Sequence, residues 1–333
     1  MILFVVSICI CFGCSTSKIS DKDTEHTTLK TENERTNINI GCMKGPTAIG
    51  MIHLLSESDV GNTENHYAYT ISGTADELSA KLINQTLDVA AVPCNMASIL
   101  NQKTNGEIVT VAINTLGVLY IVENGTTIES VADLKGKTIY STGQGTTPEY
   151  TLRYLLNKAN LDPDKDVTIE YKSEATEVVA SMAQNAEAVA MLPQPYVTIA
   201  INNNPNLHIA LDITKEWEKL CENTIVTGVL VARKSFIEEN TEAFQKFLKE
   251  YEISANFANS NIETTANLLE QYDVFKLAIA KKAIPYCNVT YLDGNEMKNY
   301  VLGYLQVLYE QNPDSVGGTM LTEEMFYVGE NTN

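Results

Sequence analysis

Short apolar segments alternate with amphipathic segments along most of the chain. In the first third, the apolar segments predict strands and the amphipathic segments predict helices, because their lengths and periods match those elements. The strands are expected at residues 37–41, 67–72 and 87–92, and the helices at 47–56, 75–85 and 95–102. This alternation predicts an α/β fold in which a mostly parallel sheet is covered by helices on both faces.

The same alternation returns in the middle of the chain, and amphipathic stretches dominate its last third. Further strands are expected at 137–141, 167–171, 188–192 and 208–211, with a helix at 149–159. The late helices are expected at 239–259, 262–271 and 296–310. A chain of 333 residues is long enough for two lobes of ordinary size or for one large domain, and two lobes are expected.

The first 14 residues form an apolar run that ends at the pair Gly13 and Cys14. Such a run is too short to span a bilayer, which takes about 20 helical residues. It predicts a lipoprotein signal that is cleaved before a lipid-modified Cys14, so that the rest of the chain lies outside the cytoplasm. Plain secretion and a cytoplasmic chain with an apolar start are the alternatives. Residues 15–36 are polar and predict a disordered tether.

The formal net charge of −19 argues against binding to nucleic acid and against adhesion to anionic lipid through a basic face. A small ligand or a protein partner remains. After loss of the signal and lipidation of Cys14, the remaining cysteines match no zinc pattern and are expected to be buried free thiols. They are Cys42, Cys94, Cys221 and Cys287. A contact between Cys42 and Cys94 stays open, because each follows a predicted strand.

Loops that follow strands are the expected place for a ligand, because ligands bind beyond the carboxyl ends of strands in α/β sheets. The candidates are residues 44–47, 93–95 and the Gly-rich stretch 142–148. Their small residues would let backbone approach a ligand, and a helix start favours an anionic or strongly polar group. The Gly-rich stretch lacks the third Gly of a dinucleotide fingerprint and the Gly-Lys-Ser/Thr ending of a phosphate loop, so no nucleotide cofactor is expected.

The order of these segments resembles that of solute-binding proteins of ABC importers, in particular the nitrate, sulfonate and thiamine-precursor binders. The similar segments are 44–47, 87–93, 131–139 and 143–146, and the likeness runs from about residue 37 to 311. The resemblance implies the type 2 periplasmic-binding-protein fold, with two lobes, two sheets and two crossovers near 116–122 and 227–232. Lobe one would comprise residues 37–119 and 227–333, on which the late helices would pack, and lobe two residues 120–226.

The resemblance also implies a ligand site between the lobes. Lobe one would contribute Lys44, Gly45, Thr47, Cys94, Asn95, Asn114 and Thr115, and lobe two Gly143, Gln144, Gly145, Thr146, Thr147, Gln194 and Tyr196. Several of these residues have an ordinary structural alternative: Lys44 could simply be solvated, and Asn95 or Gln144 could cap its own helix. Arg153 is the only guanidinium near the proposed site, so the carboxylate clamp expected of amino-acid binders is poorly supported.

The function implied is that of a lipid-anchored, extracytoplasmic substrate-binding protein that delivers a small polar, anionic or heteroaromatic solute to a membrane permease. It is expected to be a monomer with no cofactor and no metal. One alternative is an enzyme of the same fold, such as a pyrimidine synthase or a menaquinone-pathway enzyme. Against it, the histidines at 26, 53, 66 and 208 form no pair at motif spacing with a nucleophile or carboxylate. The other alternative is an adhesin or signalling ectodomain.

Overall fold

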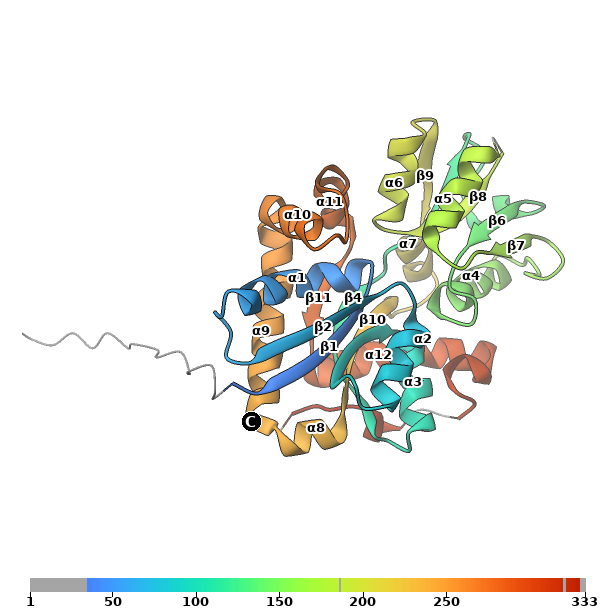
Figure 1. Ribbon diagram of the computed structural model, residues 1–333. Helices are drawn as coiled ribbons and strands as arrows, with labels where there is room; N and C mark the ends of the chain where they lie inside the picture. Colours follow the sequence, from blue (N-terminus) through green and yellow to red (C-terminus); the bar gives the residue numbers. More distant parts are fainter. Residues whose placement is uncertain (1–34, 186, 320–321, 330–333) are drawn as a thin grey trace, which may run out of the picture.

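A computed structural model describes residues 35–329 apart from 186 and 320–321. The predicted signal, Cys14 and nearly all of the predicted tether lie outside the described residues. The described chain forms two bodies, each built on its own sheet (Figure 1). No helix in the described ranges is long and apolar enough to cross a bilayer.

The first sheet has six strands in the order β11-β4-β10-β3-β1-β2. Their bounds are β1 (Asn37–Met43), β2 (His66–Ser72), β3 (Val89–Pro93), β4 (Ile108–Leu116), β10 (Val226–Arg233) and β11 (Val289–Leu292). Strands β1 to β4 share one direction, whereas β10 and β11 run the opposite way. The carboxyl ends of β1 to β4 therefore meet at one edge of this sheet.

Helices cover both faces of the first sheet. One face carries α1 (Pro46–Asp59), α8 (Lys234–Glu239), α9 (Thr241–Ser260), α10 (Ile262–Gln271), α11 (Leu277–Ala283) and the 3₁₀ helix η3 (Ile284–Tyr286). The other face carries α2 (Ala75–Ile83), α3 (Cys94–Lys103), α12 (Gly294–Gln311) and the 3₁₀ helices η4 (Pro313–Val316) and η5 (Glu323–Met325). Both layers bury apolar side chains against the sheet, which is the main stabilising contribution in such a fold.

The second sheet has five strands in the order β7-β6-β8-β5-β9. Their bounds are β5 (Leu119–Asn124), β6 (Thr138–Ser141), β7 (Thr168–Tyr171), β8 (Val189–Pro193) and β9 (Leu207–Asp212). All but β5 share one direction. Helices α5 (Ala175–Gln184) and α6 (Tyr196–Asn203) pack on one face, and α4 (Thr147–Lys158), α7 (Ile213–Glu218) and the 3₁₀ helix η2 (Val131–Leu134) pack on the other.

The chain passes between the two bodies twice. It leaves the first sheet after Leu116 and enters the second at Leu119, and it returns between Glu218 and Val226. The strands that follow these passages, β5 and β10, are antiparallel to both of their neighbours. Each sheet is therefore mixed, although most of its strands share one direction. The predicted fold class, an α/β protein with two helix-flanked sheets and two crossovers, is confirmed.

Because β4 ends only two residues before β5 begins, the carboxyl edge of the first sheet faces the corresponding edge of the second. Loops from both sheets therefore meet at the junction of the two bodies. The helix expected at 296–310 is α12, and it touches both bodies, because it packs on α3 and β4 and also contacts α4. The four cysteines in the described ranges are free, so Cys42 and Cys94 form no disulfide.

Candidate ligand site

The loop between β1 and α1 is tied back onto its own body. Thr47 Oγ1 donates to the Met43 carbonyl at 2.9 Å, and the Lys44 backbone N–H donates to the Ser72 carbonyl at 2.8 Å. Pro46 begins α1, where its missing N–H and fixed φ suit the first helical position. The Lys44 side chain is exposed, so its charge lies in water.

Asn95 crosses the junction between the two bodies. Its Oδ1 accepts from the Thr147 backbone N–H at 3.1 Å and from Thr147 Oγ1 at 3.3 Å. Its Nδ2 donates to the Ser315 carbonyl at 2.9 Å and to the Gly145 carbonyl at 3.3 Å. Asn95 is fully buried, and these four bonds use the whole hydrogen-bonding capacity of an amide. It therefore caps α4 of the opposite body, not its own helix α3.

The Gly-rich turn 143–147 uses several of its polar groups internally. The Gly145 N–H donates to Glu149 Oε2 at 2.7 Å, and the Thr146 N–H donates to the Gly143 carbonyl at 3.0 Å. With the Thr147 N–H held by Asn95, three amides of this turn already have protein acceptors. An anionic ligand at the start of α4 would have to displace the Glu149 carboxylate from the Gly145 N–H. Gln144 is exposed on the same turn.

Arg153, the guanidinium that the sequence places near this turn, is paired with acidic side chains. Its Nε donates to Glu149 Oε1 at 2.8 Å and its Nη1 to Asp164 Oδ1 at 3.0 Å. Charge-assisted pairs of this kind are strong when partly buried. The Arg153 guanidinium is therefore already paired with two carboxylates of the protein itself.

The remaining predicted residues of the second sheet lie at the carboxyl end of β8. Gln194 is buried, and its Oε1 accepts from Thr198 Oγ1 at 2.8 Å and from the Thr198 N–H at 3.3 Å. It therefore serves the first turn of α6. Tyr196 makes an edge-to-face contact with Phe275 of the other body at a centroid distance of 5.9 Å. Burial, with a smaller contribution from Glu174, raises the pKa of its hydroxyl.

Besides Asn95, the predicted residues of lobe one that are almost fully buried include Cys94, Asn114 and Thr115. Burial raises the pKa of the Cys94 thiol, so it stays protonated. Neither polar atom of the Asn114 amide has a hydrogen-bond partner among the described residues. Asn114 thus differs from Asn95, whose amide is fully used.

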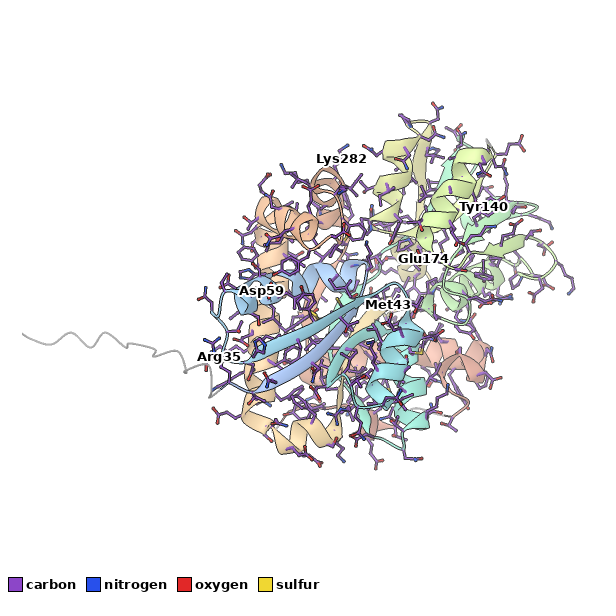
Figure 2. All side chains as sticks on the ribbon, in the orientation of Figure 1. Arg35, Met43, Asp59, Tyr140, Glu174 and Lys282 are labelled. Carbon is purple, nitrogen blue, oxygen red and sulfur yellow. The ribbon has the colours of Figure 1, made fainter. Side chains whose placement is uncertain are left out.

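The structure adds residues that the sequence analysis did not select. A Cβ on Gly73, in the loop after β2, would lie 3.4 Å from Glu174 Oε1, so this loop meets the loop after β7. Figure 2 shows Glu174 and Met43 where the two bodies approach each other. Nearby in sequence, the Lys172 Nζ lies 5.3 Å from the centre of the Tyr140 ring. The other loops were selected because they follow the carboxyl end of a strand. Glu174 also follows a strand, β7, so the same rule could have found it.

Other chemistry-bearing groups lie elsewhere or are committed to packing. The His53 ring stacks on the Phe257 ring with their centroids 3.7 Å apart, and burial lowers the pKa of His53. His208 lies 3.6 Å from the buried Glu123 at the far end of β5. Within the described ranges, no three His, Cys, Asp or Glu side chains are grouped as metal ligands.

Two surface hollows lie away from the junction. One, of about 500 Å³, is at the amino ends of β1 and β2 beside Arg35, Asp59 and His66. The other, of about 210 Å³, lies on the outer side of α4 beside Leu155 and Leu220. Neither includes a residue that the sequence predicted for the site.

Comparison with known proteins identifies related sequences. The family model described as NMT1/THI5 like matches residues 68–265. A protein of Brucella abortus named as a binding protein is 26% identical over 168 residues, which is 50% of this chain and 50% of that protein. The same holds for a binding protein of Brucella suis. The chain thus spans about half the length of the curated relatives it matches.

Solved structures share the fold at low sequence identity. An ABC transporter structure from Parabacteroides distasonis has a TM-score of 0.73 and 24% identity, and covers 88% of this chain and 99% of its own. The periplasmic aliphatic sulphonate binding protein of Escherichia coli has a TM-score of 0.68, 17% identity, and coverage of 89% and 95%. The periplasmic nitrate-binding protein of Synechocystis has a TM-score of 0.62, 13% identity, and coverage of 84% and 82%.

Proposed function

Because the chain belongs to the NMT1/THI5-like family, the family that its sequence resembled, we propose that it is the extracytoplasmic substrate-binding component of an ABC importer. It captures a small polar, anionic or heteroaromatic solute between lobe one (37–119 and 227–333) and lobe two (120–226). It then presents the solute to a permease in the membrane. The observation that carries the proposal is the meeting of the two carboxyl edges, where loops of both sheets converge.

Binding without bond chemistry is the part of the proposal that the relatives support. The Brucella relatives are named as binding proteins, and the structural neighbours include sulphonate- and nitrate-binding proteins. Within the described residues, the histidines are packed or lie away from the junction. The importer component needs no catalytic group, because its work is to bind and release.

Capture follows from the two-lobe arrangement. A solute that touches both lobes only when they are closed binds the closed state more tightly than the open one, and so shifts the population toward it. The permease then recognises the closed, loaded form. The lobes need to separate only enough for the solute to enter.

A lipid on Cys14 holds this body at the membrane in the proposed arrangement, with residues 15–36 as the tether. Labelling of cells with a clickable palmitate analogue tests this part separately. We expect the wild-type chain to carry the label and to sediment with membranes, and the Cys14→Ser chain to lose the label. An unlabelled wild-type chain in the culture medium would show plain secretion instead.

The solute-binding function is tested by a thermal-shift screen of the purified chain without residues 1–14. The panel holds sulfonates, nitrate, pyrimidines and thiamine precursors, flavins and amino acids. A compound at 100 times its Kd stabilises the folded state by about 2.7 kcal/mol, which raises Tm by several degrees in a protein of this size. We expect a dose-dependent rise for one class. Silence across the panel would favour an adhesin or signalling ectodomain.

A further inference from the structure

Glu149 holds a carboxylate of the protein itself at the start of α4, where the two bodies meet. Its Oε2 accepts from the Gly145 backbone N–H at 2.7 Å, and its Oε1 accepts from Arg153 Nε at 2.8 Å. A backbone N–H at the start of a helix, together with a guanidinium, is a usual setting for an anion in proteins. Here the chain supplies the anion, and Glu149 is 9% exposed.

Two further donor groups beside Glu149 also have acceptors within the protein. Arg153 Nη1 donates to Asp164 Oδ1 at 3.0 Å. The Thr147 N–H and Oγ1 both donate to Oδ1 of Asn95, which belongs to the other body. Each of these donors would have to leave a protein acceptor before it could bind a solute anion.

Carboxylates of both bodies lie around this position. Burial, and after it the charges of Glu149 and Asp314, raises the pKa of the Tyr150 hydroxyl, and Arg153 lowers the same pKa. Asp314 belongs to η4 of the first body, so its negative charge reaches the start of α4 from across the junction. The two carboxylates paired with Arg153, together with Asp314, exceed the charge of the guanidinium, so a free anion at this turn would be repelled.

Lack of space is not what would keep a small anion away from this turn. Gly145 is exposed, and a Cβ built on it would meet no heavy atom within 4 Å. The Gln144 side chain beside it is exposed as well. The turn is therefore open to solvent, and the exclusion of an anion comes from donors that are already used and from the surrounding negative charge.

We propose that the Glu149 carboxylate is an internal anion that takes the place of a solute anion at the start of α4, and so restricts the site to solutes with no anionic group at this end. This inference rests on the proposed solute-binding function. Of the solutes considered there, it favours uncharged heteroaromatic compounds and excludes nitrate and small sulfonates. Glu149 would then determine specificity by refusing one class of solute. A carboxylate that only caps its own helix predicts no such refusal.

The wild-type chain provides the first test, by calorimetric titration with nitrate and with methanesulfonate. The buffer is Tris, so that no sulfonate, phosphate or carboxylate competes. We expect neither anion to bind at millimolar concentration. Saturable binding of either one to the wild type would leave the solute-binding function standing and overturn the inference.

The second test removes the internal anion. Glu149→Ala frees the Gly145 N–H and one side of the Arg153 guanidinium, so we expect it to bind nitrate and methanesulfonate at least tenfold more tightly than the detection limit of the wild-type titration. The double variant Glu149→Ala with Arg153→Met should lose this gain. The matched control is Glu170→Ala, which removes the exposed carboxylate 3.3 Å from Lys172 Nζ at the end of β7, and it should bind neither anion.

Two results with these variants would contradict the inference. A folded Glu149→Ala chain that binds neither anion would show that this position does not hold an anion. Equal binding by Glu170→Ala would show a general effect of net charge. Circular dichroism establishes that each variant folds, and Glu149→Ser, whose hydroxyl can accept from the turn, takes the place of the alanine variant if that one does not fold.

The neutral compounds of the solute screen separate this inference from the function on which it rests. A neutral compound that binds the wild type, with anions refused by the wild type and accepted by Glu149→Ala, supports both. A neutral compound that binds while Glu149→Ala still refuses anions keeps the function and removes the role of Glu149. Silence of the wild type toward every compound, charged or neutral, would contradict the solute-binding function and this inference with it.

Discussion

Asn95 shows how a buried polar side chain can be fully used by the protein itself. Its amide links the first turn of α4 to η4, two elements that lie far apart in the sequence. A free asparagine in this position would have suited a ligand, but all four of its hydrogen bonds go to protein groups. Removing it would leave the Thr147 N–H and the Ser315 carbonyl, both in buried residues, without these partners.

We therefore expect Asn95→Ala to lower the free energy of unfolding by about 2–4 kcal/mol, because orphaned buried donors and acceptors keep their desolvation cost. Urea denaturation of the purified variant measures this. The matched control is Gln144→Ala, an exposed residue of the neighbouring turn, for which about 0.5 kcal/mol or less is expected. Equal and small losses in both variants would show that the Asn95 bonds do not hold in solution.

Glu250, on α9 of the first body, has a partly buried carboxylate. The Tyr67 hydroxyl and the Glu64 backbone N–H donate to it. Burial nevertheless raises its pKa above the ordinary value of 4.5. In the interval above that value, the folded state holds a proton that the unfolded state has released, so the contribution of Glu250 to stability falls as pH rises.

The free energy of unfolding of Glu250→Gln should therefore rise relative to that of the wild type as pH rises from about 4 to 8, since a neutral amide does not titrate. The measurement is a series of urea denaturations across that range. Glu252→Gln, at an exposed position of the same helix, is the control for the loss of one carboxylate from this helix. A Glu250→Gln difference that falls with pH would reverse the sign argued here.

At the scale of elements, the alternating pattern was sufficient to predict most of both sheets. The strands of the first third and the helices α1 to α3 lie within a few residues of the predicted ranges. The predicted ranges include neither β4, whose nine residues are nearly all buried, nor β11, a four-residue strand with an irregular register. The pattern also missed α8 and α11, which are too short to show a helical period.

For the candidate site, the sequence could predict which loops meet, because the carboxyl ends of parallel strands share an edge. It could not predict how the polar groups in those loops are used. Asn95, Gln194 and the turn amides find partners that are distant in sequence or depend on one rotamer.

The turn before α4 depends on two glycines with left-handed backbone. Gly143 and Gly145 both have φ of +75°. A Cβ at Gly143 would lie 2.6 Å from Thr146 Oγ1 and 2.9 Å from Pro148 Cγ, whereas a Cβ at Gly145 would meet nothing within 4 Å. The first position therefore combines backbone strain with a clash, and the second has strain alone.

We expect Gly145→Ala to cost about 1–2 kcal/mol of unfolding free energy, the usual penalty for a left-handed non-glycine residue. Gly143→Ala should cost more, because Pro148 cannot move away freely. Gly45→Ala is the control: its φ of 166° is extended and its surroundings are open, so a change near zero is expected. Urea denaturation of the three variants checks the order, and equal losses at 143 and 145 would contradict it.

At the scale of the whole molecule, the two sides of the junction are built differently. On one side a single hydrophobic core runs through both bodies. There the ring centroids of Trp217 in α7 and Tyr304 in α12 lie 5.2 Å apart, and both side chains are fully buried. On the other side the contact is smaller: Tyr196 of α6 packs edge to face on Phe275, and Lys282 Nζ of α11 lies 3.5 Å from Asn202 Oδ1 at the exposed rim. Separation of the bodies should cost least on the α6 and α11 side (Figure 1).

A reversible crosslink between α6 and α11 tests this asymmetry. With Asn202→Cys and Lys282→Cys joined by a dithio-bismaleimide linker, we expect the compound that most raises Tm in the solute screen to associate at least tenfold more slowly, because its entry requires these helices to part. Stopped-flow fluorescence measures the rate. Cleavage of the linker should restore it, and the single-cysteine variants should match the wild type.

The result discriminates between two ways of loading the same site. Slow association after crosslinking, with recovery on cleavage, places the moving side of the junction at α6 and α11 and leaves α4, α7 and α12 as the fixed side. An unchanged rate would mean that the solute enters without separation of α6 and α11. In that case the continuous core on the opposite side would have to open, and variants that weaken the contact between Trp217 and Tyr304 should then speed association.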